Sequence, residues 1–439
     1  MTLLFGNFKR LLRNVALIGG IFMAFTGLPA KGDDYSFDVA AFKPKRLETN
    51  YKLDLRPGFS FLNAGSRLYQ LSHALKEPRR TQQNHSLLVG VNGSYQAGGN
   101  SKLHFDGLLT LNRFMGETRD NHVLNEGYLL FELDAGLHLG IGKKTFKWGK
   151  GYAWNPVNFA GRQKDLNDID LALSGYSMVY SQYTRSMSGY LSNMTLTMAL
   201  VPALEDLNDD FAPTQSYSFA SQLYMLLGDT DVDFYLFAGE NGRHRFGVDF
   251  SRNLAENHEI HAELAVSPRQ SAYDILGNGA VDFSRRQKTD LLLGTRYLDH
   301  REITYILEYL HNGSGLTQRE MHNYFAAADS ALALNNRPLM RQAAYNYGEF
   351  INRQFVMRDY LYFKASKPEL FDDLYLAGSV FTILNLADKS SSTSFEVNYT
   401  GQTDQIITLR YTANLGNRNS EFGQKLSSDR VELRCQYFF

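Results

Sequence analysis

The sequence predicts an all-β protein, a single antiparallel up-and-down β-barrel that crosses a membrane. Three observations support this fold class. Short segments of alternating apolar and polar residues recur along the chain, the connections between them are tight and long in turn, and the last segment ends on an aromatic residue. Beyond residue 30 there is no run of about 18 apolar residues, the length that a membrane-spanning helix requires. We expect about 18 strands, or 16 if one hairpin is misassigned.

The first 30 residues have the three parts of a secretory signal peptide. Lys9, Arg10 and Arg13 form a basic region, residues 15–28 form an apolar core, and small residues near Ala30 offer a cleavage site. The core has the length of a signal peptide rather than of a membrane span, although an uncleaved anchor helix is the alternative. The predicted organisation follows from these limits. It is a cleaved signal peptide at 1–30, a short periplasmic segment at 31–50 and the transmembrane barrel at 51–439.

The strands are predicted from a side-chain period of two. In one example, Leu103 and Phe105 alternate with Lys102 and His104. In a transmembrane barrel the apolar positions face lipid and the polar positions face the lumen. The predicted strands are 51–61, 84–95, 102–114, 125–134, 136–146, 173–184, 190–200, 216–227, 231–240, 243–252, 257–266, 289–298, 302–312, 354–365, 371–385, 392–400, 404–414 and 429–439.

The connections between these strands alternate in length. Every second one is tight, as at Gly98-Gly99 and Gly228-Asp229, and only the short connection near Asn241-Gly242 departs from the alternation. Bacterial barrels have short periplasmic turns and longer extracellular loops, so the alternation places both termini in the periplasm. A soluble β-sandwich has no reason to show it, and a propeller would need a repeat of roughly 40–50 residues that we do not find. The long connections are 62–83, 115–124, 147–172, 201–215, 267–288, 313–353 and 415–428.

The last segment has an apolar face and a polar face. Val431, Leu433, Cys435, Tyr437 and Phe439 fall on the apolar face, where Cys435 is expected to act as a small hydrophobe. This terminal-Phe pattern resembles the closing strand of Gram-negative outer-membrane β-barrel proteins of the porin-like type, without indicating a specific family. The resemblance implies a location in the outer membrane, contact with its lipid and lipopolysaccharide, and recognition by the barrel assembly machinery through Val431–Phe439. We expect this strand to pair with residues 51–61 and to close the barrel.

Composition excludes several other classes of protein. Lys plus Arg number 45 and Asp plus Glu number 46. Because the two signs balance, the charge of the chain does not suggest a nucleic-acid partner. A single cysteine excludes an intramolecular disulfide framework and a multi-cysteine metal site. Aromatic residues make up 13% of the chain, which suits strands and the aromatic girdles of a barrel. We expect no cofactor.

The most distinctive stretch is 142–156, GKKTFKWGKGYAWNP, which holds both tryptophans. One interpretation is a solute-binding or constriction site, because lysines beside aromatic faces attract anionic or sugar-like solutes. The other is a membrane interface, with Trp at the boundary and Lys reaching lipopolysaccharide phosphates, and the residue types favour it. The candidate site residues are Lys144, Lys147, Trp148, Lys150, Tyr152 and Trp154.

Charged residues of both signs fall on predicted lumen-facing positions. Rows of mixed sign predict cross-strand ion pairs rather than a clear preference for anions or cations. Acidic runs at 165–170 and 201–215 lack the spacing of a calcium loop, so we expect surface charge and no metal site. The principal lumen-facing candidates are Arg245, Glu263, Arg296, Glu308, Arg358 and Arg410.

Two further features bear on function. In the long connection 313–353, Met321, Phe325 and Ala328 recur at helical spacing, which predicts a helical extracellular insert that either folds inward or caps the barrel as a solvated element. His104, His138 and His261 fall on predicted lumen faces and would be needed by a hydrolase, but no nucleophile motif accompanies them.

The sequence therefore predicts a porin-like channel for passive passage of small polar solutes across the outer membrane, and not an enzyme. About 16 to 18 strands can leave an aqueous passage, whereas smaller barrels are filled by side chains. The first alternative is a barrel that exports or assembles a surface polysaccharide or lipid, with 313–353 as its gate. An outer-membrane hydrolase is a further alternative. The solute and the oligomeric state are not indicated by any motif.

Overall fold

The computed structural model describes residues 46–75, 81–114, 117–164, 174–213, 215–351 and 355–439. All of these residues belong to one compact unit, Arg46–Phe439. The predicted signal peptide at 1–30 lies outside the described residues and stays a prediction. The first strand begins at Leu47, within the last residues of the stretch expected to precede the barrel.

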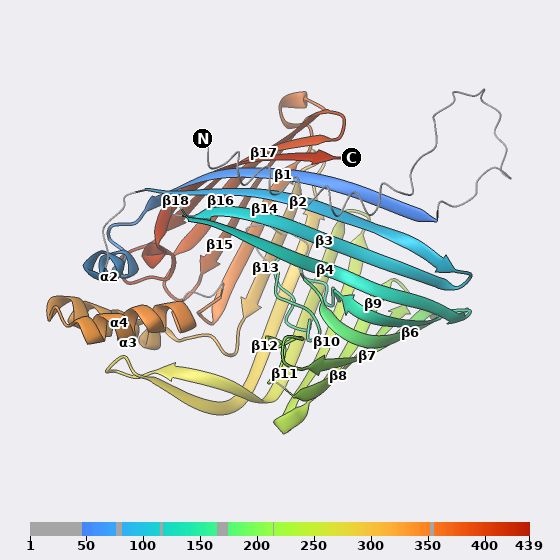
Figure 1. The fold of residues 1–439 in the computed structure, drawn as a ribbon, viewed down its shortest axis with the longest axis horizontal. Coiled ribbons are helices and arrows are strands. Elements are labelled where there is room, and N and C mark those ends of the chain that lie inside the picture. Colours follow the sequence, from blue (N-terminus) through green and yellow to red (C-terminus); the bar gives the residue numbers. More distant parts are fainter. Residues whose placement is uncertain (1–45, 76–80, 115–116, 165–173, 214, 352–354) are drawn as a thin grey trace. The chain divides into compact units, whose positions relative to one another are not determined.

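The described chain forms one antiparallel sheet of 18 strands that closes on itself (Figure 1). Each strand pairs with its neighbours in sequence, and β1 pairs with β18, for example Leu53 with Tyr437. Phe439 exchanges two backbone hydrogen bonds with Tyr51, of 3.0 and 3.1 Å. The predicted strand number, order and closure are therefore confirmed. The strands are β1 (Leu47–Leu62), β2 (Thr81–Gly98), β3 (Ser101–Phe114), β4 (Glu117–Asp134), β5 (Leu137–Lys144), β6 (Tyr176–Ser186), β7 (Leu191–Ala203), β8 (Ser216–Leu227), β9 (Thr230–Gly239), β10 (Arg243–Ala255), β11 (His258–Ile275), β12 (Val281–Leu298), β13 (Thr304–His311), β14 (Asp359–Lys367), β15 (Leu376–Asn385), β16 (Ser391–Gln402), β17 (Gln405–Leu415) and β18 (Ser427–Phe438).

Two of the predicted long loops are wrong, because most of their residues continue the strands. β4 begins at Glu117, so residues 117–124 pair with β3. The segment 267–288 extends β11 and β12 into a long hairpin that turns at 276–280. A strand that continues past an apolar layer is solvated on both faces and loses the apolar alternation, although its backbone hydrogen bonds persist. The sequence pattern therefore ends before the strand does.

The two ends of the barrel differ. At the turn end, the connections from even-numbered to odd-numbered strands are short, and the longest joins β14 to β15 through η4 (Leu370–Asp372). At the loop end lie the long connections and the three α-helices of the described residues: α2 (Arg67–Leu75), α3 (Gln318–Ala333) and α4 (Arg337–Asn346) (Figure 1). The remaining short helices η2 (Glu240–Gly242), η3 (Tyr347–Ile351) and η5 (Phe422–Gln424) are also in loop-end connections.

Side chains on the wall alternate as expected for a barrel with a polar interior. Asp54 is 1% exposed and points inward, whereas its neighbour Leu55 is 40% exposed on the outer face. On β18, Arg434 and Gln436 are buried inside and Leu433 is 39% exposed outside. Cys435 shares the outward face with Leu433, as predicted. The outer surface is therefore apolar and the inner wall is polar, the reverse of a soluble domain.

The helical insert packs against the loop end of the barrel. α3 begins with a capping box in which Thr317 and Glu320 satisfy each other's backbone N–H groups. Its apolar side, with Met321, Tyr324 and Phe325, is buried in a cluster that includes wall residues of β13–β15. The predicted helices are confirmed, and their apolar packing does not match a solvated cap. Among the described residues, no helix is long and apolar enough to cross a membrane.

Candidate functional site

Residues 145–164, which follow β5, enter the barrel instead of covering its mouth. This segment (the inward loop) is the green coil inside the strands in Figure 1. Two carboxylates on the inner wall hold its backbone. Glu263 of β11 accepts hydrogen bonds from the backbone N–H of Lys150 (2.7 Å), Gly151 (2.7 Å) and Val157 (3.3 Å). Glu308 of β13 accepts the N–H groups of Tyr152 (2.5 Å) and Ala153 (2.8 Å).

Small residues make this close approach possible. A Cβ atom at Gly151 would lie 2.1 Å from the Trp154 carbonyl and 2.4 Å from Leu292, so only glycine fits there. On the wall, Gly294 of β12 lies between His261 and Glu308 in the strand register. Its missing side chain leaves room for the hydrogen bond of 2.9 Å between His261 Nε2 and Glu308 Oε1. His261, Gly294 and Glu308 thus form one row across β11, β12 and β13 beneath the inward loop.

Apolar contacts fix both sides of the inward loop. Trp148 is 4% exposed and stacks on Phe146, with ring centroids 5.2 Å apart. Trp154 is 5% exposed and packs edge-to-face on Phe355 and Tyr362. The interface interpretation of 142–156 is therefore wrong for both tryptophans. They lie inside the barrel, because the inward loop turns its apolar side chains onto the wall and the insert.

The candidate lysines are spread along the inward loop rather than gathered into one anion site. Lys144, at the end of β5, lies over the Tyr128 ring at 4.0 Å, and Lys147 is exposed. Lys150 pairs with Asp233 at 2.7 Å. Burial alone would lower the pKa of Lys150, but the hydrogen bond and the negative charge of Asp233 outweigh it and raise the pKa above its ordinary value. The Lys150 side chain is therefore bound to the barrel wall through Asp233.

The Tyr152 side chain is also bound to the barrel wall. Its hydroxyl donates to Glu259 at 2.9 Å. Burial and this contact raise the pKa of Tyr152 to about 12. Together with the five backbone hydrogen bonds to Glu263 and Glu308, the side chains of Lys150 and Tyr152 fix the inward loop to the barrel wall.

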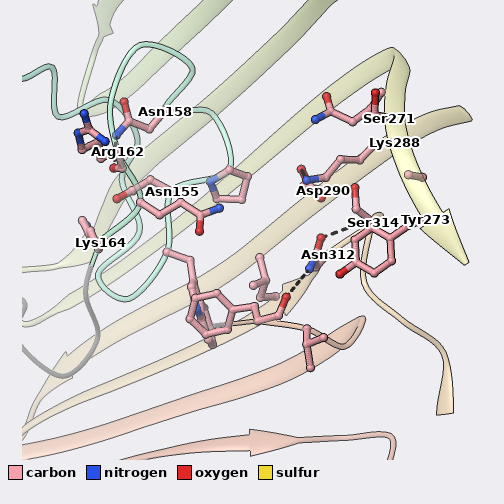
Figure 2. Close-up of a pocket in the computed structure, with 18 of the residues that line it drawn as sticks. Asn155, Asn158, Arg162, Lys164, Ser271, Tyr273, Lys288, Asp290, Asn312 and Ser314 are labelled. Atoms are coloured by element: carbon pink, nitrogen blue, oxygen red, sulfur yellow. Dashed lines mark hydrogen bonds and ion pairs between the residues drawn. The ribbon is translucent and has the colours of Figure 1, made fainter. Parts of the chain in front are cut away.

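A cavity of about 460 Å³ borders the inward loop on its loop-end side. Figure 2 shows Asn155, Asn158, Arg162 and Lys164 of the inward loop on one side, facing Lys288 and Asp290 of β12 across the cavity. Aromatic rings complete it, among them Trp154, Tyr273, Phe283, Phe350 and Phe355. Of these lining residues, only Trp154 is among the candidate site residues predicted from the sequence. The others come from segments far apart in the chain, and no local motif marks them.

The predicted lumen charges form ion pairs and hydrogen bonds on the wall. Arg410 of β17 pairs with Glu396 of β16. Arg434 pairs with Asp54 at 2.9 Å across the closing β1–β18 seam. Arg245 lies over the ring of Phe237 at 5.1 Å. Two candidates lie nearer the ends: the Arg296 guanidinium is 3.9 Å from Glu259, and Arg358, which precedes β14, donates to the Gly315 carbonyl at 3.0 Å.

The three histidines are not brought together. They lie on β3, β5 and β11. His104 stacks on Tyr128 at 4.9 Å, and His261 is held between Glu308 and Glu259. Within the described residues no group of three or more His, Cys, Asp or Glu side chains has the arrangement of a metal site. The acidic run at 165–170 lies outside the described residues, and Asp210 of the other run pairs with Arg162.

No protein-family model matches the chain, and no curated protein matches it. Several solved porins and outer-membrane proteins are similar to it over most of its length. OccK5 (OpdH) of Pseudomonas aeruginosa is 11% identical, with a TM-score of 0.49, over 89% of this chain and 98% of that chain. The outer membrane protein OprD of Pseudomonas aeruginosa is 12% identical, with a TM-score of 0.49, over 89% and 94%. A mutant porin of Rhodopseudomonas blastica is 10% identical, with a TM-score of 0.43, over 90% and 100%.

Proposed function

We propose that this protein is a porin-like channel in the outer membrane of a Gram-negative bacterium, through which small polar solutes pass passively. The observation that carries the proposal is a closed barrel with a charged inner wall that water can reach. The inward loop narrows the lumen of this barrel. The side chains of Lys52, Arg296 and Arg430 point inward yet are 31%, 48% and 41% exposed. An inner wall that served only as a packed core would bury such groups completely.

The apolar outer surface supports the membrane location. Leu, Phe, Val and Tyr side chains occupy the outward positions of successive strands, such as Phe59 at 47% and Phe395 at 52% exposure. In water such a surface would drive aggregation, whereas in a bilayer it contacts the hydrocarbon chains of the lipids. The loop end would then face outward and the turn end would face the periplasm. Export through the signal peptide at 1–30 belongs to the same proposal.

Electrical recording tests the proposal directly. The full mature chain, refolded in detergent and checked by circular dichroism, should insert into planar bilayers and give discrete conductance steps. The inward loop should keep the single-channel conductance below that of a barrel of equal strand number without such a loop. Bilayers that stay silent after insertion of verified folded protein would refute a channel function.

A further inference from the structure

The cavity of about 460 Å³ beside the inward loop has a volume in the range of ~300–1,000 Å³ typical of small-molecule sites. It has three walls: the inward loop from Ala153 to Lys164, the β11–β12 hairpin, and a third wall made by Phe350, Phe355 and Val356 together with the end of β13. Glu263 and Glu308 hold the inward loop, and Phe355 of the third wall packs against Trp154. The Tyr273 hydroxyl also donates to the Phe350 carbonyl at 2.9 Å, joining the hairpin to the third wall. The cavity is therefore preformed.

The charged groups that line the cavity already have protein partners. Arg162 pairs with Asp210 and donates to the Ser174 carbonyl at 2.9 Å. Lys164 donates to the carbonyls of Gly151 (2.6 Å) and Tyr152 (3.3 Å). Its burial, reinforced by the charge of Lys147, lowers its pKa below the ordinary value despite nearby Glu308 and Glu263. A charged solute would therefore compete with Asp210 for Arg162 and with two backbone carbonyls for Lys164.

The second charged pair is Lys288 and Asp290, whose charged atoms lie 3.0 Å apart. Asp290 also accepts the backbone N–H of Gly313 at 2.9 Å. The pair thus presents both a donor and an acceptor to the cavity while its charges cancel. It suits a ligand with hydroxyl groups, which can donate and accept at once.

Three uncharged side chains in the lining have no hydrogen-bond partner among the described residues. The side chains of Gln163, Gln270 and Ser271 make no hydrogen bond with the parts of the chain that the structure describes. Aromatic rings lie beside them, with Phe350 4.9 Å from Tyr273 and 5.8 Å from Phe283. Aromatic faces cover the C–H surface of a ligand while amides and hydroxyls bond its polar edge.

We propose that this cavity is a binding site for an uncharged polyhydroxylated solute of the size of a simple sugar, at the approach to the constriction. The proposal rests on the proposed channel function and names its solute class. A passing solute would exchange water for the uncommitted amides and hydroxyls without breaking an ion pair. Charged solutes of equal size would be disfavoured, because they would have to compete with the ion pairs of Arg162, Lys288 and Asp290 and with the carbonyls that hold Lys164.

Glucose, glucuronate and glucosamine test the charge argument, since they share one ring and differ in charge. Binding is measured by calorimetry on the detergent-solubilised full chain, and entry by swelling of proteoliposomes. We expect glucose to bind most tightly and to enter fastest. Tighter binding of glucuronate or glucosamine, or no measurable binding of glucose, would overturn the proposal.

Two variants and a control sharpen the test. Gln270→Leu should weaken glucose binding about three- to tenfold, the value of one hydrogen bond between uncharged groups. Gln182→Leu on β6, outside the cavity, should leave it unchanged. Asp290→Asn frees Lys288 and should shift the preference toward glucuronate, whereas an unchanged preference contradicts the charge-compensation argument.

Conductance recorded on the same preparations separates the two proposals: a conducting protein without glucose preference refutes only this site, whereas a silent one refutes the channel.

Discussion

Glu263→Gln is the substitution that tests the inward loop most directly. Oε1 of Glu263 accepts three donors, the N–H groups of Lys150 and Gly151 and the Nδ2 of Asn155 at 2.9 Å. Oε2 accepts the N–H of Val157. All four contacts are donors, so the carboxylate acts only as an acceptor. Glutamine keeps the volume, but it loses the charge and replaces one oxygen with a donor.

The expected loss follows from these contacts. Hydrogen bonds to a charged group contribute roughly 1.5–3 kcal/mol and neutral ones about 1 kcal/mol, so three weakened bonds cost ~3 kcal/mol. The N–H of Val157 would face another donor, which adds about 1–2 kcal/mol. A total of ~4–5 kcal/mol raises the population of the undocked loop by roughly three to four powers of ten. The barrel itself should remain folded, because its wall hydrogen bonds do not involve the inward loop.

Hydrogen exchange measures this population. The amides of Lys150 and Gly151 should exchange faster in Glu263→Gln by the same factor, while amides of β1 and β18 keep their protection. Glu396→Gln is the matched control, since Glu396 also lies on the inner wall but pairs with Arg410 and not with the inward loop. Unchanged exchange in folded Glu263→Gln, or equal acceleration in Glu396→Gln, would refute the reasoning.

Two other predictions concern closure and the insert. Deleting Phe439 removes the two backbone hydrogen bonds to Tyr51, so the yield of heat-modifiable folded barrel on gels should fall, while the molecules that fold keep their conductance; an unchanged yield would contradict a role in closure. Burial would raise the pKa of Asp329 on α3, but its hydrogen bond and ion pair with Arg67 and the charge of Arg418 outweigh burial and lower the pKa below its ordinary 3.8. A lowered carboxyl pKa stabilises the folded state above about pH 4, and this contribution is lost as the pH falls through the lowered value. Proteolysis of the insert should therefore increase below about pH 4 in the wild type, by the small effect of a half-exposed pair of roughly 0.5–1 kcal/mol. Asp329→Asn should lack that acid step and be more susceptible at neutral pH, and an identical pH profile would contradict the assignment.

Local patterns predicted the strands because the alternation is set residue by residue. Where lipid-facing and lumen-facing positions differ in polarity, as at Leu53 to Arg56, the strand was found. Where both faces meet water, as in 117–124 of β4, the pattern vanished and a loop was predicted instead. The predicted helical insert succeeded for the same reason, since its apolar period is local.

The site depended on contacts that no local pattern contains. Glu263 was predicted to face the lumen, but its partners lie more than 100 residues earlier in the chain. Without these contacts, the two tryptophans of 142–156 were interpreted as membrane anchors, the usual place for Trp near a strand end. The cavity was missed because its walls come from three separate connections and hairpins.

The sequence by itself determined a barrel of about 18 strands, its lipid and lumen faces, and the closing pair of first and last strands. These follow from a period of two and from the need to leave no open sheet edge. Only the tertiary structure decided the direction of the loop after β5 and the cavity beside it. Whether that loop turns inward depends on two buried carboxylates from distant strands, Glu263 and Glu308, and a local pattern does not encode such partners.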